Sequence, residues 1–104
     1  MTDFVTVMMT IDSEADAAAL ARALVERKLA ACVQRMPIAS CYEWDGEIHD
    51  EAEILLLIKT RRALYGELEA TIRELHSYTT PEIVCLPIAA GSKPYLDWIA
   101  SVTL

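Results

Sequence analysis

The sequence predicts an α+β domain in which an antiparallel β-sheet carries two helices on one face and a third helix follows at the C-terminus. Residues 30–60 contain two long β-forming stretches joined by Asp45 and Gly46. An Asp-Gly pair between β-formers is typical of a type I′ hairpin turn, which needs positive φ at both central residues. Apolar residues also recur at helical spacing both before and after this hairpin.

Length and charge exclude several classes of protein. The 104 residues suit one domain with its own core, which we assign to residues 1–104. A net charge of −7 opposes binding to nucleic acid. The apolar runs are far shorter than the roughly 20 residues of a membrane span, and the N-terminal MTDFV lacks the basic region of a signal peptide. We therefore expect a cytoplasmic protein that binds neither nucleic acid nor membrane.

The cysteines also favour a cytoplasmic location. Cys32, Cys41 and Cys85 are odd in number and widely spaced, which indicates reduced thiols rather than a disulfide framework. We expect each to be a small buried apolar residue.

The predicted hairpin is unusually long for a small domain. Its turn pairs Trp44 with Glu47, Tyr42 with His49 and Ser40 with Glu51. At about 3.3 Å per residue the first arm would extend roughly 50 Å, whereas a domain of this size has a radius of gyration of about 13 Å. Part of the hairpin should therefore overhang its own core and expose edges that another copy of the chain covers. In the alternative, Pro37 divides the arm into two short strands.

The hairpin tip also holds the densest group of acidic residues. Its simplest interpretation is a solvated tip whose charges limit edge-to-edge aggregation. The group consists of Glu43, Asp45, Glu47, Asp50, Glu51 and Glu53.

The remaining elements follow from periodicity and capping signals. Residues 4–11 are apolar on both faces and predict a central strand. Ser13, with Asp16 three positions later, resembles a capping box and predicts a helix over 14–28. Thr60 is expected to cap a second amphipathic helix that ends at residues 76–78.

Two further elements complete the chain. Residues 82–88 predict a short strand, and Pro87 near its end indicates a sheet edge. Gly91, Ser92 and Pro94 precede a last helix. The order β-α-β-β-α-β-α matches a ferredoxin-like split β-α-β sandwich with an extra C-terminal helix and an antiparallel sheet.

Most functions associated with this topology need residues that the chain lacks. An RNA-recognition module needs stacking aromatics and a basic surface, and an iron-sulfur ferredoxin needs four closely spaced thiolates. A soft-metal chaperone would carry paired cysteines after the first strand, and an acylphosphatase-like enzyme uses an asparagine; residues 9–16 contain no cysteine and the chain no asparagine. The only histidines, His49 and His76, form no evident nucleophile-base pair, so we expect no enzymatic activity.

Six collinear motifs carry a family resemblance. RKLAACVQ, the turn Y-x-W-x-G-x-I, IKT, H-x-Y-x-x-P-E-I, LPI and YLDWI span nearly the whole chain and resemble the CutA family of divalent-ion tolerance proteins. The resemblance implies a homotrimer in which each long hairpin extends the sheet of a neighbour. It implies a link to divalent cations, copper in particular. The similar architecture of PII-type regulators leaves a signalling or interaction trimer as the alternative.

The metal ligands implied by the resemblance are only partly present. Some family members resemble copper binders through a first-strand cysteine and two histidines, whose positions match Met9, Leu75 and His76. Met9 and His76 alone make a poor site for copper(II) or zinc, so we expect weak or indirect metal binding. The simplest interpretation of His76, near a helix C-terminus, is a favourable partner of the helix dipole.

The resemblance also implies a pocket between subunits. By motif match it is lined by Cys32, Trp44, Glu51, Lys59, Tyr78 and Glu82. In the alternative interpretation, Trp44 and Tyr78 are interface anchors and Lys59 forms an ion pair with Glu82.

Overall fold

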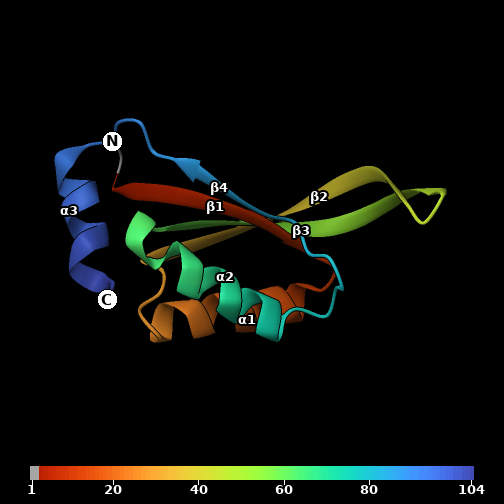
Figure 1. Cartoon of the computed structure of the whole chain (residues 1–104), viewed down its shortest axis with the longest axis horizontal. Helices are drawn as coiled ribbons and strands as arrows, with labels where there is room; N and C mark the ends of the chain where they lie inside the picture. Colours follow the sequence, from red (N-terminus) through yellow and green to blue (C-terminus); the bar gives the residue numbers. More distant parts are fainter. Residues whose placement is uncertain (1–2) are drawn as a thin grey trace.

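The computed structural model describes residues 3–104 and has the predicted element order (Figure 1). The strands form a four-stranded antiparallel sheet in the order β2-β3-β1-β4. Helices α1 and α2 cover one face of this sheet, and α3 lies at the end remote from the hairpin tip (Figure 1). The α+β class is thus confirmed. The elements are β1 (Phe4–Ile11), α1 (Glu14–Glu26), β2 (Cys32–Trp44), β3 (Glu47–Arg61), the short 3₁₀ helix η1 (Arg62–Leu64), α2 (Tyr65–Leu75), β4 (Ile83–Pro87) and α3 (Lys93–Val102).

The core lies between the sheet and the two covering helices. Alternate residues of β1 point toward the helices, and Val5, Val7 and Met9 are fully buried. Leu24 of α1 and Leu68 of α2 meet them from the other side. Full burial of one such side chain contributes about 2 kcal/mol, so this layer holds both helices on the sheet.

The other face of the sheet carries apolar side chains that no helix within residues 3–104 covers. Met36, Val84 and Leu86 are each more than two-fifths exposed. We call this surface the open face. Its apolar members are Met8, Met36, Leu55, Leu57, Val84 and Leu86.

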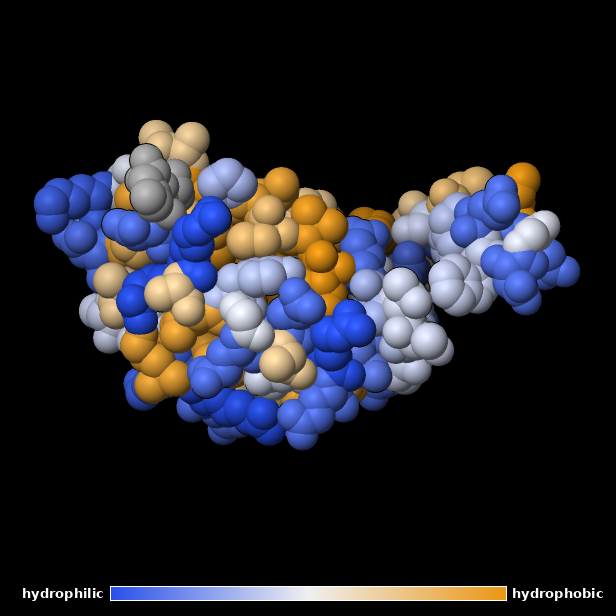
Figure 2. Space-filling model, viewed as in Figure 1, coloured by the Kyte–Doolittle hydropathy of each residue, from blue (hydrophilic) through white to orange (hydrophobic). Residues whose placement is uncertain are grey.

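The hairpin turn and its register are those predicted. Asp45 and Gly46 have φ of 54° and 80°, and Trp44 pairs with Glu47, Tyr42 with His49 and Ser40 with Glu51. Residues 41–52 are exposed except for the half-buried His49, and the tip projects beyond both covering helices (Figure 1). The surface of this tip is mainly hydrophilic (Figure 2).

Pro37 does not divide the arm. It pairs with Ile54 inside a continuous strand. The strand β2 lies at an edge of the sheet. A proline, which has no N–H to donate, is tolerated in an edge strand because no strand on the outer side needs that hydrogen bond. The prediction that Pro87 marks an edge is also confirmed, because β4 pairs with β1 alone.

The capping prediction is confirmed for α1 and wrong for α2. The Asp16 N–H donates to Ser13 Oγ at 3.2 Å. Thr60, in contrast, lies inside β3, is fully buried and donates from Oγ1 to the Leu29 carbonyl at 2.7 Å. Pairing of β1 with β3 continues as far as Arg61, so the ladder holds this residue in the strand and α2 begins only at Tyr65.

Three smaller corrections concern burial and length. Cys41 is exposed and Cys32 and Cys85 are half-buried, so the prediction that all three are buried is wrong. The helix α1 ends at Glu26 rather than at 28, because Lys28 has a φ of 60°. No helix among residues 3–104 is both long and apolar enough to cross a membrane.

Candidate functional site

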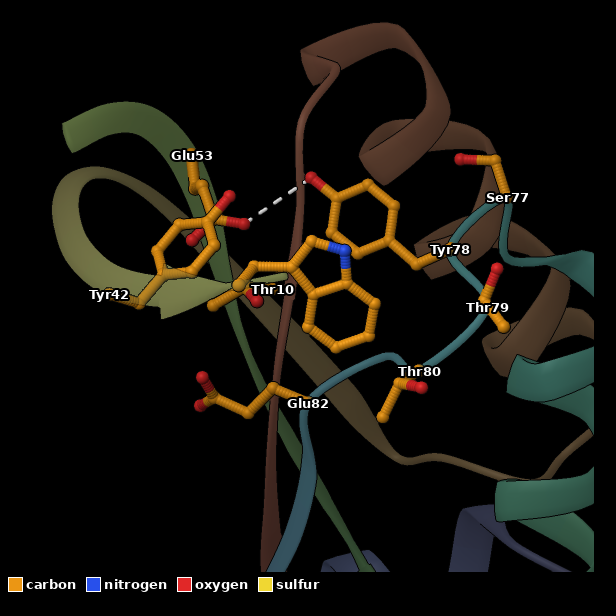
Figure 3. Close-up of a pocket in the computed structure, with 9 residues that line it drawn as sticks. Thr10, Tyr42, Glu53, Ser77, Tyr78, Thr79, Thr80 and Glu82 are labelled. Carbon is orange, nitrogen blue, oxygen red and sulfur yellow. Dashed lines mark hydrogen bonds between the residues drawn. The ribbon is translucent and has the colours of Figure 1, made fainter. Parts of the chain in front are cut away.

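A cavity of about 500 Å³ lies where the hairpin meets the loop between α2 and β4 (Figure 3). The hairpin, the end of β1 and this loop line it. The hairpin contributes two aromatic side chains and a carboxyl group, the end of β1 contributes a hydroxyl group, and the loop supplies a third aromatic ring and further polar side chains. The lining residues are Thr10, Tyr42, Trp44, Glu53, Ser77, Tyr78, Thr79, Thr80 and Glu82.

Tyr78 is held in place from both ends. Its hydroxyl group donates to Glu53 Oε2 at 3.3 Å (Figure 3), and its backbone N–H donates to His76 Nδ1 at 3.0 Å. Its ring packs on the imidazole of His76, with ring centroids 4.5 Å apart. Burial, followed by the nearby carboxylates of Asp12 and Glu53, raises the pKa of Tyr78 to about 12.

Tyr42 is fixed in a similar way on the hairpin. Its ring stacks on His49 across the strand pair, at 5.3 Å between centroids and 18° between planes. Its hydroxyl group donates to Glu51 Oε2 at 3.2 Å. Desolvation raises the pKa of Tyr42, and Glu51 adds to the effect. Two tyrosines therefore enter the cavity, each held by one histidine and one glutamate.

Glu53 is the most deeply buried acidic group at the cavity. Only 7% of its surface is exposed, so its assignment to the solvated tip is wrong. The reason is its position: Glu53 pairs with Ile38 well inside the hairpin, where Tyr78 covers it. Glu82 comes from the loop just before β4 and reaches the same cavity (Figure 3).

The structure brings together part of the site predicted from the sequence. Trp44, Tyr78 and Glu82 line the cavity, and Glu51 touches it through Tyr42. Cys32 and Lys59 lie opposite one another at the far end of the hairpin, some 12 residues or roughly 40 Å of strand from Trp44. The Lys59 ammonium group donates to Gln34 Oε1 at 3.0 Å within the chain, and an ion pair with Glu82 across a subunit boundary stays a prediction.

The prediction missed Tyr42, Glu53 and Thr10 as lining residues. The strand period offered one signal, because Glu53 lies two residues beyond Glu51 and thus on the same face of β3. The position of Thr10 depends on how β1 packs beside β3, which local sequence does not encode. The loop residues Ser77, Thr79 and Thr80 also line the cavity. No sequence motif or spacing around them predicted this position.

The two predicted metal ligands, Met9 and His76, are both engaged in other contacts. His76 Nε2 donates to the Thr10 carbonyl at 2.8 Å while its Nδ1 accepts the Tyr78 N–H, so backbone groups occupy both ring nitrogens. Met9 is fully buried in the core. Among residues 3–104 no group of three or more His, Cys, Asp or Glu side chains is placed to hold a metal ion.

Comparison with known proteins gives the family. The family described as CutA1 divalent ion tolerance protein matches residues 5–102. The divalent-cation tolerance protein CutA of Thermus thermophilus is 47% identical over 98 residues, which cover 93% of this chain and 95% of that protein. Human CutA is 43% identical over 96 residues, covering 91% of this chain but only 54% of that longer protein.

Solved structures agree with the sequence comparison. The structure of CutA from Synechococcus elongatus has a TM-score of 0.96 and is 36% identical, covering 100% of this chain and 93% of that one. Sequence and fold therefore match along almost the whole length. The chain belongs to the CutA1 divalent ion tolerance family.

Proposed function

We propose that this protein is a non-enzymatic cytoplasmic homotrimer that takes part in the response to divalent cations, copper among them, and that it binds metal weakly or acts on it indirectly. The observation that carries the assembly part is the open face. Exposed apolar side chains such as Val84 and Leu86 cover it, and the free edges of β2 and β4 flank it. Closing such edges in a ring leaves none for fibre growth.

The proposed role in the response to divalent cations rests on family membership. The expectation that metal binding is weak rests on the contacts of His76. A metal at either ring nitrogen of His76 has to displace a backbone hydrogen bond, and the buried thioether of Met9 is its one predicted partner. Copper(II) and zinc favour several imidazole or thiolate ligands. Direct binding through this residue is therefore expected to be weak.

Two properties of the cysteines support the proposed cytoplasmic location and the proposed lack of enzymatic activity. None of the three forms a disulfide, which suits a reducing compartment. Burial raises the pKa of the Cys85 thiol, which lowers the thiolate fraction that a nucleophile needs.

Sedimentation velocity at micromolar concentration tests the assembly, and a trimer is the expected result. A stable monomer contradicts the proposal. Calorimetric titration with copper(II) tests the metal part: we expect a small heat that decreases in His76→Ala. Absence of heat with the wild-type protein excludes direct binding and leaves only the indirect role.

A second candidate is a signalling or interaction trimer of the PII type that binds a small molecule. The cavity beside the hairpin favours it, because aromatic side chains with a few fixed polar groups are typical of small-molecule sites. A bound organic ligand in this cavity, with no change in affinity when copper is added, would favour this candidate over the metal function.

A further inference from the structure

A second cavity lies where the start of β1 meets η1 and α3. Figure 1 shows the start of β1 and the helix α3 at the end of the molecule remote from the hairpin tip. The cavity has a volume of about 570 Å³, and we call it the α3 cavity. It shares no lining residue with the cavity beside the hairpin or with the open face. Its lining residues are Asp3, Phe4, Arg61, Arg62, Ala63 and Ala100.

Arg61 is held against α3 through its guanidinium group. Its Nε donates to Thr103 Oγ1 at 3.1 Å, and Thr103 Oγ1 in turn donates to the Ile99 carbonyl at 2.9 Å. The backbone of Arg61 pairs with Phe4 at the end of the ladder between β1 and β3. The bond to Thr103 uses one of the five N–H donors of a guanidinium group, which leaves the four on the two terminal nitrogens for another acceptor.

The two arginines of the α3 cavity form no ion pair within residues 3–104. The ion pairs among these residues are formed by Arg22, Arg35, His49 and Lys93. Asp3 lies on the cavity wall, but its contact with Arg62 runs through the backbone, where the Arg62 N–H donates to the Asp3 carbonyl at 2.8 Å. Two adjacent positive charges therefore border this cavity without an ion pair.

The negative net charge of the protein does not cancel these two charges locally. The densest group of acidic residues, 43–53, belongs to the hairpin tip, and the longest extent of the molecule is 44 Å. Salt screens exposed charges over about 8 Å at physiological ionic strength. The potential at the α3 cavity is therefore set mainly by its own wall, where two arginines outnumber one aspartate.

We propose that the α3 cavity binds a small phosphate monoester. A planar guanidinium group forms paired hydrogen bonds with phosphate oxygens, and two such groups match the nearly double negative charge of a monoester at neutral pH. The volume falls in the size range of small-molecule sites. Phe4, Ala63 and Ala100 provide an apolar wall for the organic part of the ester. This inference goes beyond the proposed function and requires neither copper binding nor the cavity beside the hairpin.

Phenyl phosphate is the probe that tests the proposal. Calorimetric titrations of the full chain at constant ionic strength would compare it with phenyl sulfate, which has the same shape and one negative charge, and with inorganic phosphate, which lacks the apolar part. We expect saturable binding of one phenyl phosphate per chain, and roughly tenfold weaker binding of each comparison compound. Equal affinity for phenyl phosphate and either comparison compound, or no binding at all, would overturn the proposal.

Two variants and a control locate the site. Arg62→Gln removes one positive charge at an exposed residue whose backbone makes the contact with Asp3, and should weaken binding of phenyl phosphate roughly tenfold. Arg61→Lys keeps the charge but loses the planar fork, and should also weaken binding. Arg73→Gln, an exposed residue in the last turn of α2, should leave the affinity unchanged. Equal losses in Arg62→Gln and Arg73→Gln, with both variants folded by circular dichroism, would reduce the effect to net charge and contradict the assignment.

The assembled protein offers a competing source of negative charge. A carboxylate of a second copy seated between Arg61 and Arg62 would neutralise both arginines and exclude the ester. A crystal structure of the wild-type protein with phenyl phosphate distinguishes the two. A phosphate group bound by the two guanidinium groups supports the proposal, and a carboxylate of a neighbouring subunit in that position overturns it.

Discussion

Tyr78 contacts both the buried carboxyl group at the cavity and the histidine beside it. Its phenol lies between the carboxyl group of Glu53 and the imidazole of His76, and His76 in turn reaches the Thr10 carbonyl. One short segment at the end of α2 is thereby tied to both β1 and β3. The same contacts that fix an aromatic wall of the cavity also hold the loop on the sheet.

The raised pKa of Tyr78 predicts a loss of stability in alkali. The phenol keeps its proton up to about pH 12 when folded but only to about pH 10 when unfolded. The folded state therefore binds more protons between these values, and the free energy of unfolding falls as pH rises through this window. Urea unfolding at several pH values should show a shallower fall in Tyr78→Phe than in wild type, and its absorbance titration should lack the latest-ionising phenol. Identical slopes would contradict the assignment.

Thr60 shows how a buried hydroxyl group is used in this fold. Thr60→Val keeps the shape but removes the donor to the Leu29 carbonyl. Leaving a buried carbonyl without its partner should cost about 1–3 kcal/mol of unfolding free energy. Thr79→Val, at an exposed loop position, should change stability by less than about 0.5 kcal/mol. Denaturant titration of both variants measures the difference, and similar values for the two would show that the hydrogen bond contributes little.

At the scale of elements, α1 and α3 offer a direct comparison of helix caps. Ser13 accepts the Asp16 N–H at the start of α1, whereas Ser92 occupies the same position in α3 without a side-chain capping bond. Ser13→Ala should destabilise the protein by about 1 kcal/mol, and Ser92→Ala by less than about 0.5 kcal/mol. Thermal or urea unfolding compares them, and an equal cost would mean that the Ser13 contact is not a stabilising cap.

The difference between Ser13 and Thr60 shows what local sequence predicts in this protein. Ser13, Asp45 and Gly46 act through neighbouring residues, so the first helix, the turn and the hairpin register followed from spacing alone. Thr60 carries an equally good capping signal, but pairing with Val5, which is 55 positions away in sequence, keeps it in the strand. A local preference worth about 1 kcal/mol does not outweigh a strand ladder and a core contact.

The candidate site was predictable to a similar extent. Trp44, Tyr78 and Glu82 were recovered from motifs, but the burial of Glu53 arises from the loop that folds over it. Lys59 and Cys32 lie at the other end of the hairpin within one chain, so their place in a pocket between subunits stays a prediction. Sequence motifs identify the residues that this chain shares with its family. Which of these residues lie close together in space depends on the topology of the sheet.

At the scale of the whole molecule, the asymmetry of the sheet is the dominant feature. One face is buried beneath α1 and α2, which Figure 1 shows on the same side of the sheet. The other face carries exposed apolar side chains such as Val84 and Leu86. Burying apolar surface yields roughly 25 cal/mol per Å², which favours association through the open face. We expect the acidic residues of the tip, such as Glu43 and Glu47, to limit edge-to-edge pairing between hairpins by mutual repulsion.

Two valines of equal exposure test whether the open face drives assembly. Val84 lies on the open face of β4 and is 44% exposed, and Val25 lies on α1 and is 43% exposed. If the open face forms the interface of the proposed trimer, Val84→Lys should place a charge in that interface and shift the protein toward monomer at micromolar concentration, because an unpaired charge buried at an interface costs several kcal/mol. Val25→Lys should leave the oligomeric state unchanged. Sedimentation velocity over a dilution series measures both variants, with circular dichroism to verify that each is folded. A folded Val84→Lys variant that stays trimeric over the same range as Val25→Lys would exclude this part of the open face from the interface, and the assembly would then have to form through the strand edges and the hairpin alone.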